Sequence, residues 1–93
     1  MINMYSWDPK KNDHNKEKHG ISFEEAVKHI FEDQNLLVFD VAYNKNEPRH
    51  AIIGKYKKKY YTGIFTIRSN NIRIISVRRA RHDEEKQAKD QRL

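Results

Sequence analysis

Three side chains in this sequence are of the types that could cleave RNA without a metal ion. That reaction needs a group to take the proton of the ribose 2′-hydroxyl, an acid for the leaving oxygen, and cations around the phosphate. His19 is the best acid–base candidate, because imidazole titrates near neutrality. Arg73 and Arg78 could bind phosphate through paired guanidinium hydrogen bonds. The structural alternatives are a helix C-terminal cation for His19, and a solvated face or cross-strand ion pairs for the arginines.

Positive charge is concentrated between residues 45 and 80. This stretch holds ten Lys and Arg against one acid, Glu47, so it carries a net charge of +9, whereas the whole chain carries +6. Four aromatic residues are interleaved with these cations: Tyr56, Tyr60, Tyr61 and Phe65. Basic charge with aromatics on a sheet is typical of a surface that binds the backbone of RNA or DNA. The pattern does not distinguish a protein that cuts this backbone from one that only binds it.

Several kinds of site are excluded. The chain has no cysteine, so it forms no disulfide and no thiolate metal site. It has no Gly-rich phosphate loop and neither His-x-x-x-His nor His-Glu-x-x-His. No apolar run approaches the ~18 residues of a membrane span, and the N-terminus lacks the apolar region of a signal peptide. We therefore expect one cytoplasmic domain over residues 1–93, without a metal, a cofactor or a membrane contact.

The first predicted helix runs from Pro9 to about Lys18. Asp8 is a favoured N-cap, proline is favoured at the first helical position, and Gly20 is the favoured left-handed terminator. The helix is almost wholly polar, so we expect it on the surface or against a partner. Residues 4–7 before it could form a short edge strand.

A second helix is predicted from about residue 23 to 32. Ser22 and Glu25 have the spacing of a capping box. The apolar residues that follow recur at i, i+3, i+4, i+7 and i+8, which gives one apolar stripe: Phe23, Ala26, Val27, Ile30 and Phe31. This stripe should cover a sheet.

Four strands and a polar tail complete the predicted fold. Strand-like runs lie near 35–43, 49–56, 60–68 and 71–78, and the short links between them favour an antiparallel meander. Strict alternation of side chains puts Arg68 and Arg73 on the face away from the helices and Ser76 on the helix side. Arg78 also falls on the helix side, but at a strand end it could reach either face. The tail, Arg79 to Leu93, should form a short helix that frays or is ordered by a partner. The fold class is α+β, with two N-terminal helices, a four-stranded antiparallel sheet and a C-terminal helix.

Two runs of the sequence resemble a known toxin family. The start of BrnT-type toxins is similar to Trp7-Asp8-x-x-Lys11-x-x-x-Asn15-x-x-Lys18-His19-Gly20-Ile21-x-Phe23-Glu24-Glu25-Ala26. Their last strand and the turn into the final helix are similar to Arg73-Ile74-Ile75-Ser76-Val77-Arg78-Arg79-Ala80-x-x-x-Glu84. Arg49 and Ile53-Gly54 also fall where the family has an arginine and an Ile/Leu-Gly pair. The resemblance covers about residues 5 to 85. Val77 replaces the usual alanine, and Ala88 stands where the family commonly has a tyrosine.

The resemblance implies a ribonuclease toxin of a type II toxin–antitoxin pair with a RelE-like fold. Such a toxin arrests growth by cutting RNA and is neutralised by a ribbon-helix-helix (BrnA-like) antitoxin, through which operator DNA is bound. It favours a functional role for six residues: Lys11, His19, Arg49, Arg73, Arg78 and Glu84. By itself, Glu84 in so polar a tail would be read as a solvent-exposed carboxylate.

The predicted reaction is attack of the ribose 2′-hydroxyl on the adjacent phosphate. Lys and Arg would stabilise the developing charge, and His19 or Lys11 would move the proton. Four further cations are predicted to contact RNA: Lys57, Lys58, Arg68 and Arg79. Two other functions remain open at this point. One is a non-catalytic nucleic-acid-binding module, and the other is an interaction domain whose basic face receives an acidic antitoxin.

Overall fold

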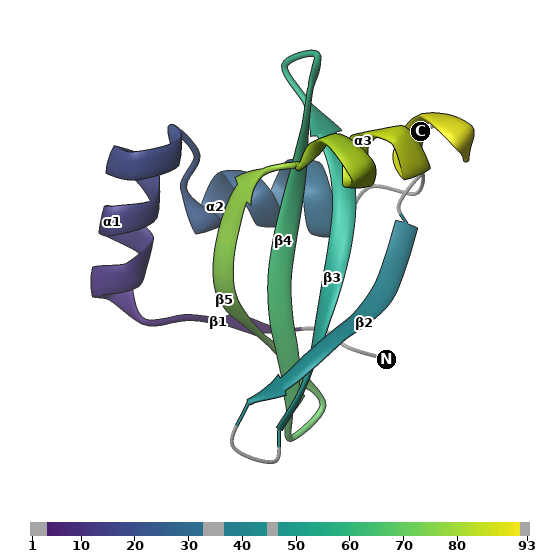
Figure 1. The fold of residues 1–93 in the computed structure, drawn as a ribbon. Helices are drawn as coiled ribbons and strands as arrows, with labels where there is room; N and C mark the ends of the chain where they lie inside the picture. Colours follow the sequence, from purple (N-terminus) through teal and green to yellow (C-terminus); the bar gives the residue numbers. More distant parts are fainter. Residues whose placement is uncertain (1–3, 33–36, 45–46, 92–93) are drawn as a thin grey trace.

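The computed structural model describes residues 4–32, 37–44 and 47–91 and shows a sheet of five strands in the order β1-β5-β4-β3-β2 (Figure 1). The strands are β1 (Tyr5–Ser6), β2 (Leu37–Asn44), β3 (Glu47–Tyr56), β4 (Lys59–Arg68) and β5 (Asn71–Arg79). The helical segments are α1 (Pro9–His19), α2 (Phe23–Ala26), the π-helical turn η1 (Val27–Phe31) and α3 (His82–Asp90). The predicted α+β class is confirmed.

The four long strands are antiparallel, as expected, but the complete sheet is mixed. β1 adds a parallel edge to β5, with Tyr5 beside Ile72 and Ser6 beside Arg73. The edge strand expected within residues 4–7 is therefore present. The arrangement of helices and sheet is roughly consistent with the RelE-like fold that the resemblance implies.

Helix α1 has the predicted ends. The Asp8 side chain accepts a hydrogen bond from the Lys10 N–H at 2.8 Å, and Gly20 follows the helix with a φ of 76°. The helix is attached to the sheet through its buried residue, Asn15. The Asn15 amide donates to the Ile21 carbonyl at 2.9 Å and accepts the Val77 N–H of β5 at 3.1 Å. A polar side chain thus joins α1 to the edge of β5, where β1 has already ended.

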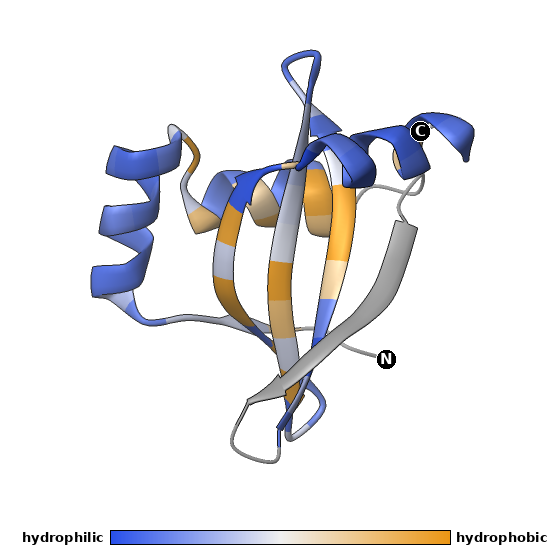
Figure 2. Cartoon of the chain, in the orientation of Figure 1, coloured by the Kyte–Doolittle hydropathy of each residue, from blue (hydrophilic) through white to orange (hydrophobic). Residues whose placement is uncertain are grey.

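Segments α2 and η1 cover one face of the sheet, and Figure 2 shows hydrophobic bands on β3, β4 and β5 at their level. Ser22 and Glu25 form the predicted capping box. Two glycines let η1 approach the strands closely. A Cβ on Gly54 would lie 3.0 Å from Ile30 Cγ2, and one on Gly63 would lie 2.8 Å from Phe31 Cζ. We call this side of the sheet the packed face; its residues include Ile52, Phe65, Ile74 and Val77.

The opposite side, which we call the open face, includes Ile53, Thr62 and Thr66, and α3 lies across one end of it (Figure 1). Helix α3 buries Ala88 against Ile53 and Tyr60. The tail is therefore helical, as predicted. It also has a packing role that its polar composition did not indicate, since Glu84 and Ala88 are both buried.

A bulge in β5 reverses the predicted faces near the end of the sheet. The register pairs Ile64 with Ser76 and then Phe65 with Ile74, so Ile75 has no partner on β4. One extra residue on one strand shifts every later side chain to the other face.

Strict alternation was consequently wrong for the second half of β5. Ser76 and Arg78 lie on the open face, because they pair with Ile64 and Thr62, whereas Val77 takes the buried position on the packed face. Arg73, before the bulge, lies on the open face as predicted. The bulge therefore brings Arg73 and Arg78 to the same side of the sheet.

Candidate functional site

Two arginines flank a threonine in one row across the open face. Arg73 of β5 pairs with Thr66 of β4, and the β3–β4 register, continued one residue beyond His50 and Phe65, sets Arg49 beside the same threonine. Two inter-strand spacings separate the Cα atoms of Arg49 and Arg73, which is roughly 10 Å. Thr66 is fully buried, and its hydroxyl donates to the Pro48 carbonyl at 2.7 Å. The threonine is thus structural, and the two guanidinium groups on either side of it are the chemical feature.

Neither arginine of this pair forms an ion pair or a hydrogen bond with a carboxylate of the described residues; the nearby Glu47, whose pKa the charge of Arg49 helps to lower, is bonded to Arg68 instead. The Arg73 side chain is half-buried and makes no hydrogen bond or ion pair within that part of the chain. The Nε of Arg49 is buried, and no described group accepts a hydrogen bond from it. A buried donor without an acceptor is rare in native proteins. Two unpaired cations on one face of the sheet, of which Arg49 has this buried free donor, form a site suited to an anion.

The other end of the open face holds an arginine in the opposite situation. Arg78 donates to both carboxylate oxygens of Glu84, at 2.7 and 3.0 Å. Glu84, 8% exposed, also accepts from the Thr62 hydroxyl at 3.0 Å and from the Arg81 N–H at 2.7 Å. These four hydrogen bonds fix the start of α3 to the sheet and hold Arg78 in one orientation.

The same contacts decide the charge of Glu84. The hydrogen bond from Arg78, followed by those from the Arg81 N–H and Thr62, lowers the pKa of Glu84 to about 2, against an opposing effect of burial. The carboxylate is therefore ionised at neutral pH and has no proton to donate. Its geometry suits a group that positions Arg78 better than it suits a general acid.

His19 lies at the C-terminal end of α1, near Arg78. Burial lowers the pKa of His19 below its usual value, and the charges of Lys18, His14 and Arg78 act in the same direction. The imidazole is mostly neutral at pH 7 and can accept a proton. The structure thus brings the predicted acid–base candidate to the β5 edge of the open face.

Lys11 has a less defined position. It is exposed and lies one helical turn before Asn15, so it belongs to the side of α1 that meets β5. Its side chain makes no hydrogen bond or ion pair with any residue that the structure describes. Because two cations form neither a hydrogen bond nor an ion pair with each other, the proton-transfer role of Lys11 beside the sheet arginines stays a prediction.

The four cations predicted to contact RNA do not form one surface. Lys57 and Lys58 make the turn between β3 and β4 with φ angles of 52° and 66°, and both are exposed. Arg79 lies 5.8 Å from the centre of the Tyr61 ring, on the packed side. Arg68 is on the open face, but Glu47 holds it by hydrogen bonds of 2.7 and 2.9 Å. Of the four, Arg68 alone shares a face with Arg49 and Arg73.

The sequence model of the family described as "ribonuclease toxin, BrnT, of type II toxin–antitoxin system" matches residues 7–84. This chain belongs to the BrnT toxin family. The matched region contains both runs that resemble the family, and all six candidate catalytic residues lie within it. Membership makes the protein a toxin of the ribonuclease class, with RNA as its target and an antitoxin as its partner. No curated protein sequence matches the chain.

Two residues that position the site were not identified from the sequence as doing so. Asn15 is part of the BrnT-like motif, yet its role emerges only where its amide meets β5. Thr62 supports Glu84 from the middle of β4. An asparagine in the middle of a polar helix was the available signal for the first, and there was none for the second. No helix in the described parts of the chain is long and apolar enough to cross a membrane.

Proposed function

We propose that this BrnT-family protein is a metal-independent endoribonuclease that arrests growth in the cytoplasm. The observation that carries the proposal is the pair of arginines, Arg49 and Arg73, that flank Thr66 on the open face without a carboxylate partner among the described residues. RNA supplies the missing negative charge in the form of a phosphate. Bidentate guanidinium contacts to phosphate are strong and directional.

In the proposed reaction the 2′-oxygen attacks the adjacent phosphorus, and the P–O5′ bond breaks. His19, neutral at pH 7, takes the proton of the 2′-hydroxyl. Because His19 lies near Arg78, this step requires the Arg73 side chain to extend along β5 toward Arg78 when it holds the phosphate. Arg49 and Arg73 stabilise the extra negative charge of the pentacovalent state. The products are a 2′,3′-cyclic phosphate and a 5′-hydroxyl, and a proton, from Lys11 or from solvent, goes to the leaving 5′-oxygen.

Arg78 has a supporting role in this proposal. Along β5 it lies five residues beyond Arg73, and at about 3.3 Å per residue the two Cα atoms are separated by roughly 15 Å. Because Glu84 occupies both of its terminal nitrogens, Arg78 contributes its field and the anchoring of α3 rather than a second clamp on the same phosphate. Glu84 is then a positioning residue.

The test is cleavage of a 5′-labelled RNA in the presence of EDTA by the wild type and by Arg49→Ala and Arg73→Ala. We expect EDTA to have no effect, and each substitution to lower the rate by roughly 10²- to 10³-fold, the usual cost of removing one group that stabilises transition-state charge. Arg79→Ala is the matched control, since Arg79 is an exposed arginine of β5 that lies on the packed side, against Tyr61.

Two results would sink the mechanism. One is loss of cleavage in EDTA, and the other is wild-type cleavage by both the Arg49 and the Arg73 variants. Binding of RNA without any scission by the wild type would favour the non-catalytic binding module.

The proposed partner is a ribbon-helix-helix antitoxin that also binds operator DNA. The support for it is membership in a type II toxin family. Co-expression with the adjacent short reading frame should restore growth, and the purified pair should shift the DNA upstream of the two genes in a gel. A toxin that is silenced by an antisense RNA rather than by a protein would contradict this.

A further inference from the structure

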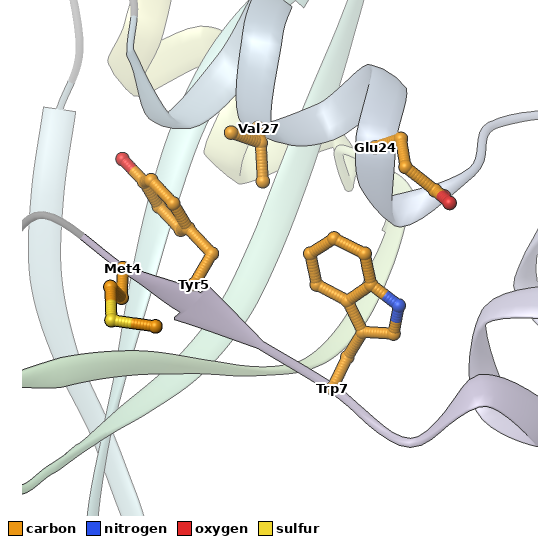
Figure 3. Close-up of a pocket in the computed structure, with 5 residues that line it drawn as sticks. All are labelled: Met4, Tyr5, Trp7, Glu24 and Val27. Atoms are coloured by element: carbon orange, nitrogen blue, oxygen red, sulfur yellow. The ribbon is translucent and has the colours of Figure 1, made fainter.

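An open groove lies away from the basic row, between the β1 segment and the helices of the packed face. It has a volume of about 470 Å³ and is lined by Met4, Tyr5, Trp7, Glu24 and Val27. Figure 3 shows Tyr5 and Trp7 pointing from the β1 segment toward Val27, with Glu24 at the border. None of these residues takes part in the proposed cleavage. The groove is therefore a separate feature of the surface.

The groove belongs to the apolar part of the surface. Met4 and Ile67 are the large hydrophobic side chains exposed within the described residues, at 63% and 47%. The sheet register links Ile67 to Tyr5, which lines the groove: Tyr5 pairs with Ile72, and Ile72 pairs with Ile67. Met4, which precedes Tyr5, lines the groove itself. The apolar strip thus runs from the groove across β5 to β4. Apolar strips with a polar border mark places where another protein binds.

The border of the groove is acidic, in a chain with a net charge of +6. The Glu24 carboxylate accepts a hydrogen bond from the Asn12 amide at 2.7 Å and has no Lys or Arg partner among the described residues. Glu32 is close enough for its charge, together with the larger effect of burial, to raise the pKa of Tyr5. Their neighbour Glu25, in contrast, is neutralised by Lys16 at 2.7 Å. Neither Glu24 nor Glu32 forms an ion pair with a described residue, and Lys28, four residues from each on the same helical segment, is the one cation between them, so the border keeps a net negative charge for an external cation.

The apolar lining and the acidic border of the groove indicate what kind of molecule binds in it. An acidic border repels the phosphates of RNA. A second copy of the chain, docked through this groove about a two-fold axis, would bring its own acids against Glu24 and Glu32, which is unfavourable. A protein segment with a large apolar side chain next to Lys or Arg satisfies both the apolar lining and the acidic border.

We propose that this groove is where the antitoxin docks, through an apolar side chain flanked by basic residues. The proposal rests on the proposed function only in taking the type II antitoxin as the protein partner. The position also suggests how docking neutralises the toxin. β1 is the edge of the sheet, and its residue Ser6 pairs with Arg73. A partner seated in the groove therefore lies one strand from Arg73 and can reach the open face around this edge.

The test measures antitoxin binding and RNA cleavage separately on the same full-length variants. The probe is the purified protein encoded by the reading frame adjacent to the toxin gene, titrated by calorimetry. The variants are Glu24→Lys and the double change Met4→Asp with Ile67→Asp, all at exposed positions. Because Glu24→Lys also removes the hydrogen bond from Asn12, circular dichroism first checks that each variant is folded. Glu17→Lys is the matched control for charge, because Glu17 is exposed on α1, outside the groove.

We expect the groove variants to bind the antitoxin at least tenfold more weakly, to cleave RNA at the wild-type rate, and to resist neutralisation. Arg73→Ala should show the reverse, with cleavage lowered by roughly 10²- to 10³-fold and antitoxin binding within about threefold of the wild type. Unchanged binding by both groove variants overturns the proposal, as does binding that is lost only when Arg49 or Arg73 is replaced. A wild-type dimer that the double variant converts to a monomer would overturn it in favour of a second copy.

Failure of the proposed function would be seen independently. If the wild type cleaves no RNA, the cleavage mechanism falls, while the binding data still decide whether the groove receives the antitoxin.

Discussion

The two ends of the open face present the same residue type in opposite states. At one end Arg49 and Arg73 form no ion pair or hydrogen bond with a carboxylate of the described residues, and at the other Glu84 accepts hydrogen bonds from both terminal nitrogens of Arg78. A charged group that is already paired gains little from a new anion, whereas an unpaired one gains a great deal. The number of basic residues on a face therefore does not identify the binding site. What identifies it is whether each basic side chain is already paired with a carboxylate of the protein.

This contrast separates a structural role from a chemical role. From the sequence alone, all three arginines had been grouped as candidates for contact with the phosphate. Arg78 with Glu84 ties α3 to the sheet and belongs to the architecture, while Arg49 and Arg73 are available for chemistry. Both ends belong to one rigid sheet, so the first supports the second by fixing what lies around it. This difference can be tested by substitutions at each end. Those at the Arg78 end should lower the stability of the fold, and those at the Arg49–Arg73 end should lower the activity.

The largest expected effect on stability is that of Glu84→Ala. It leaves Arg78 and the Thr62 hydroxyl without their partner in a buried setting, and breaking a buried ion pair from one side typically costs about 3–5 kcal/mol. Urea unfolding followed by circular dichroism measures the loss. Arg73→Ala, by comparison, should leave the midpoint nearly unchanged, because the side chain has no described partner to lose.

Glu85→Ala is the control for Glu84→Ala, since Glu85 is on the same helix and its contact with Lys89, at 3.5 Å, is at the surface. A Glu84→Ala protein with wild-type stability but no activity would show that Glu84 acts in the chemistry rather than in positioning.

The second prediction concerns acid. The pKa of Glu84 is lowered from 4.5 to about 2 in the folded protein, so its stabilising contribution is fully present above about pH 4.5 and is lost as pH falls toward 2. At 1.36 kcal/mol per pKa unit this contribution is at most about 3 kcal/mol. Glu25, with a pKa also lowered to about 2, chiefly by its hydrogen bond from Lys16, acts in the same window.

The midpoint of urea unfolding should therefore fall between pH 5 and pH 2, and less steeply in Glu84→Gln than in the wild type. Parallel pH profiles for the two proteins would mean that Glu84 is not held ionised by Arg78.

The smallest of the three effects is that of Asn15→Ala. The change leaves the Val77 N–H and the Ile21 carbonyl without a partner, which should cost about 1–3 kcal/mol. Since Asn15 is what holds α1 to β5, His19 should also be positioned less well. We expect cleavage at pH 7 to fall severalfold while Arg73-dependent RNA binding is retained. Asp13→Ala, an exposed change on the same helix, is the control; equal effects of the two would rule out a tethering role for Asn15.

Local patterns predicted the elements well because they depend on near neighbours. Asp8, Pro9 and Gly20 set the ends of α1, and Ser22 with Glu25 set the start of α2, since caps act within three or four residues. The four long strands also fell close to their predicted places. The face of Arg78 could not be predicted in this way, because one unpaired residue, Ile75, reverses the alternation after it.

The sequence by itself determined the element types, the excess of positive charge in residues 45–80 and the motifs of the BrnT family. Only the tertiary structure decided which cations are neutralised and which remain available. Arg49 and Arg73 are neighbours because β4 lies between their strands, and Arg78 is paired because α3 folds back over the open face. The physical reason is the distance along the chain over which each interaction acts. Capping and periodicity act over a few residues of chain, whereas the pairing of charges depends on strand register, which local sequence does not fix.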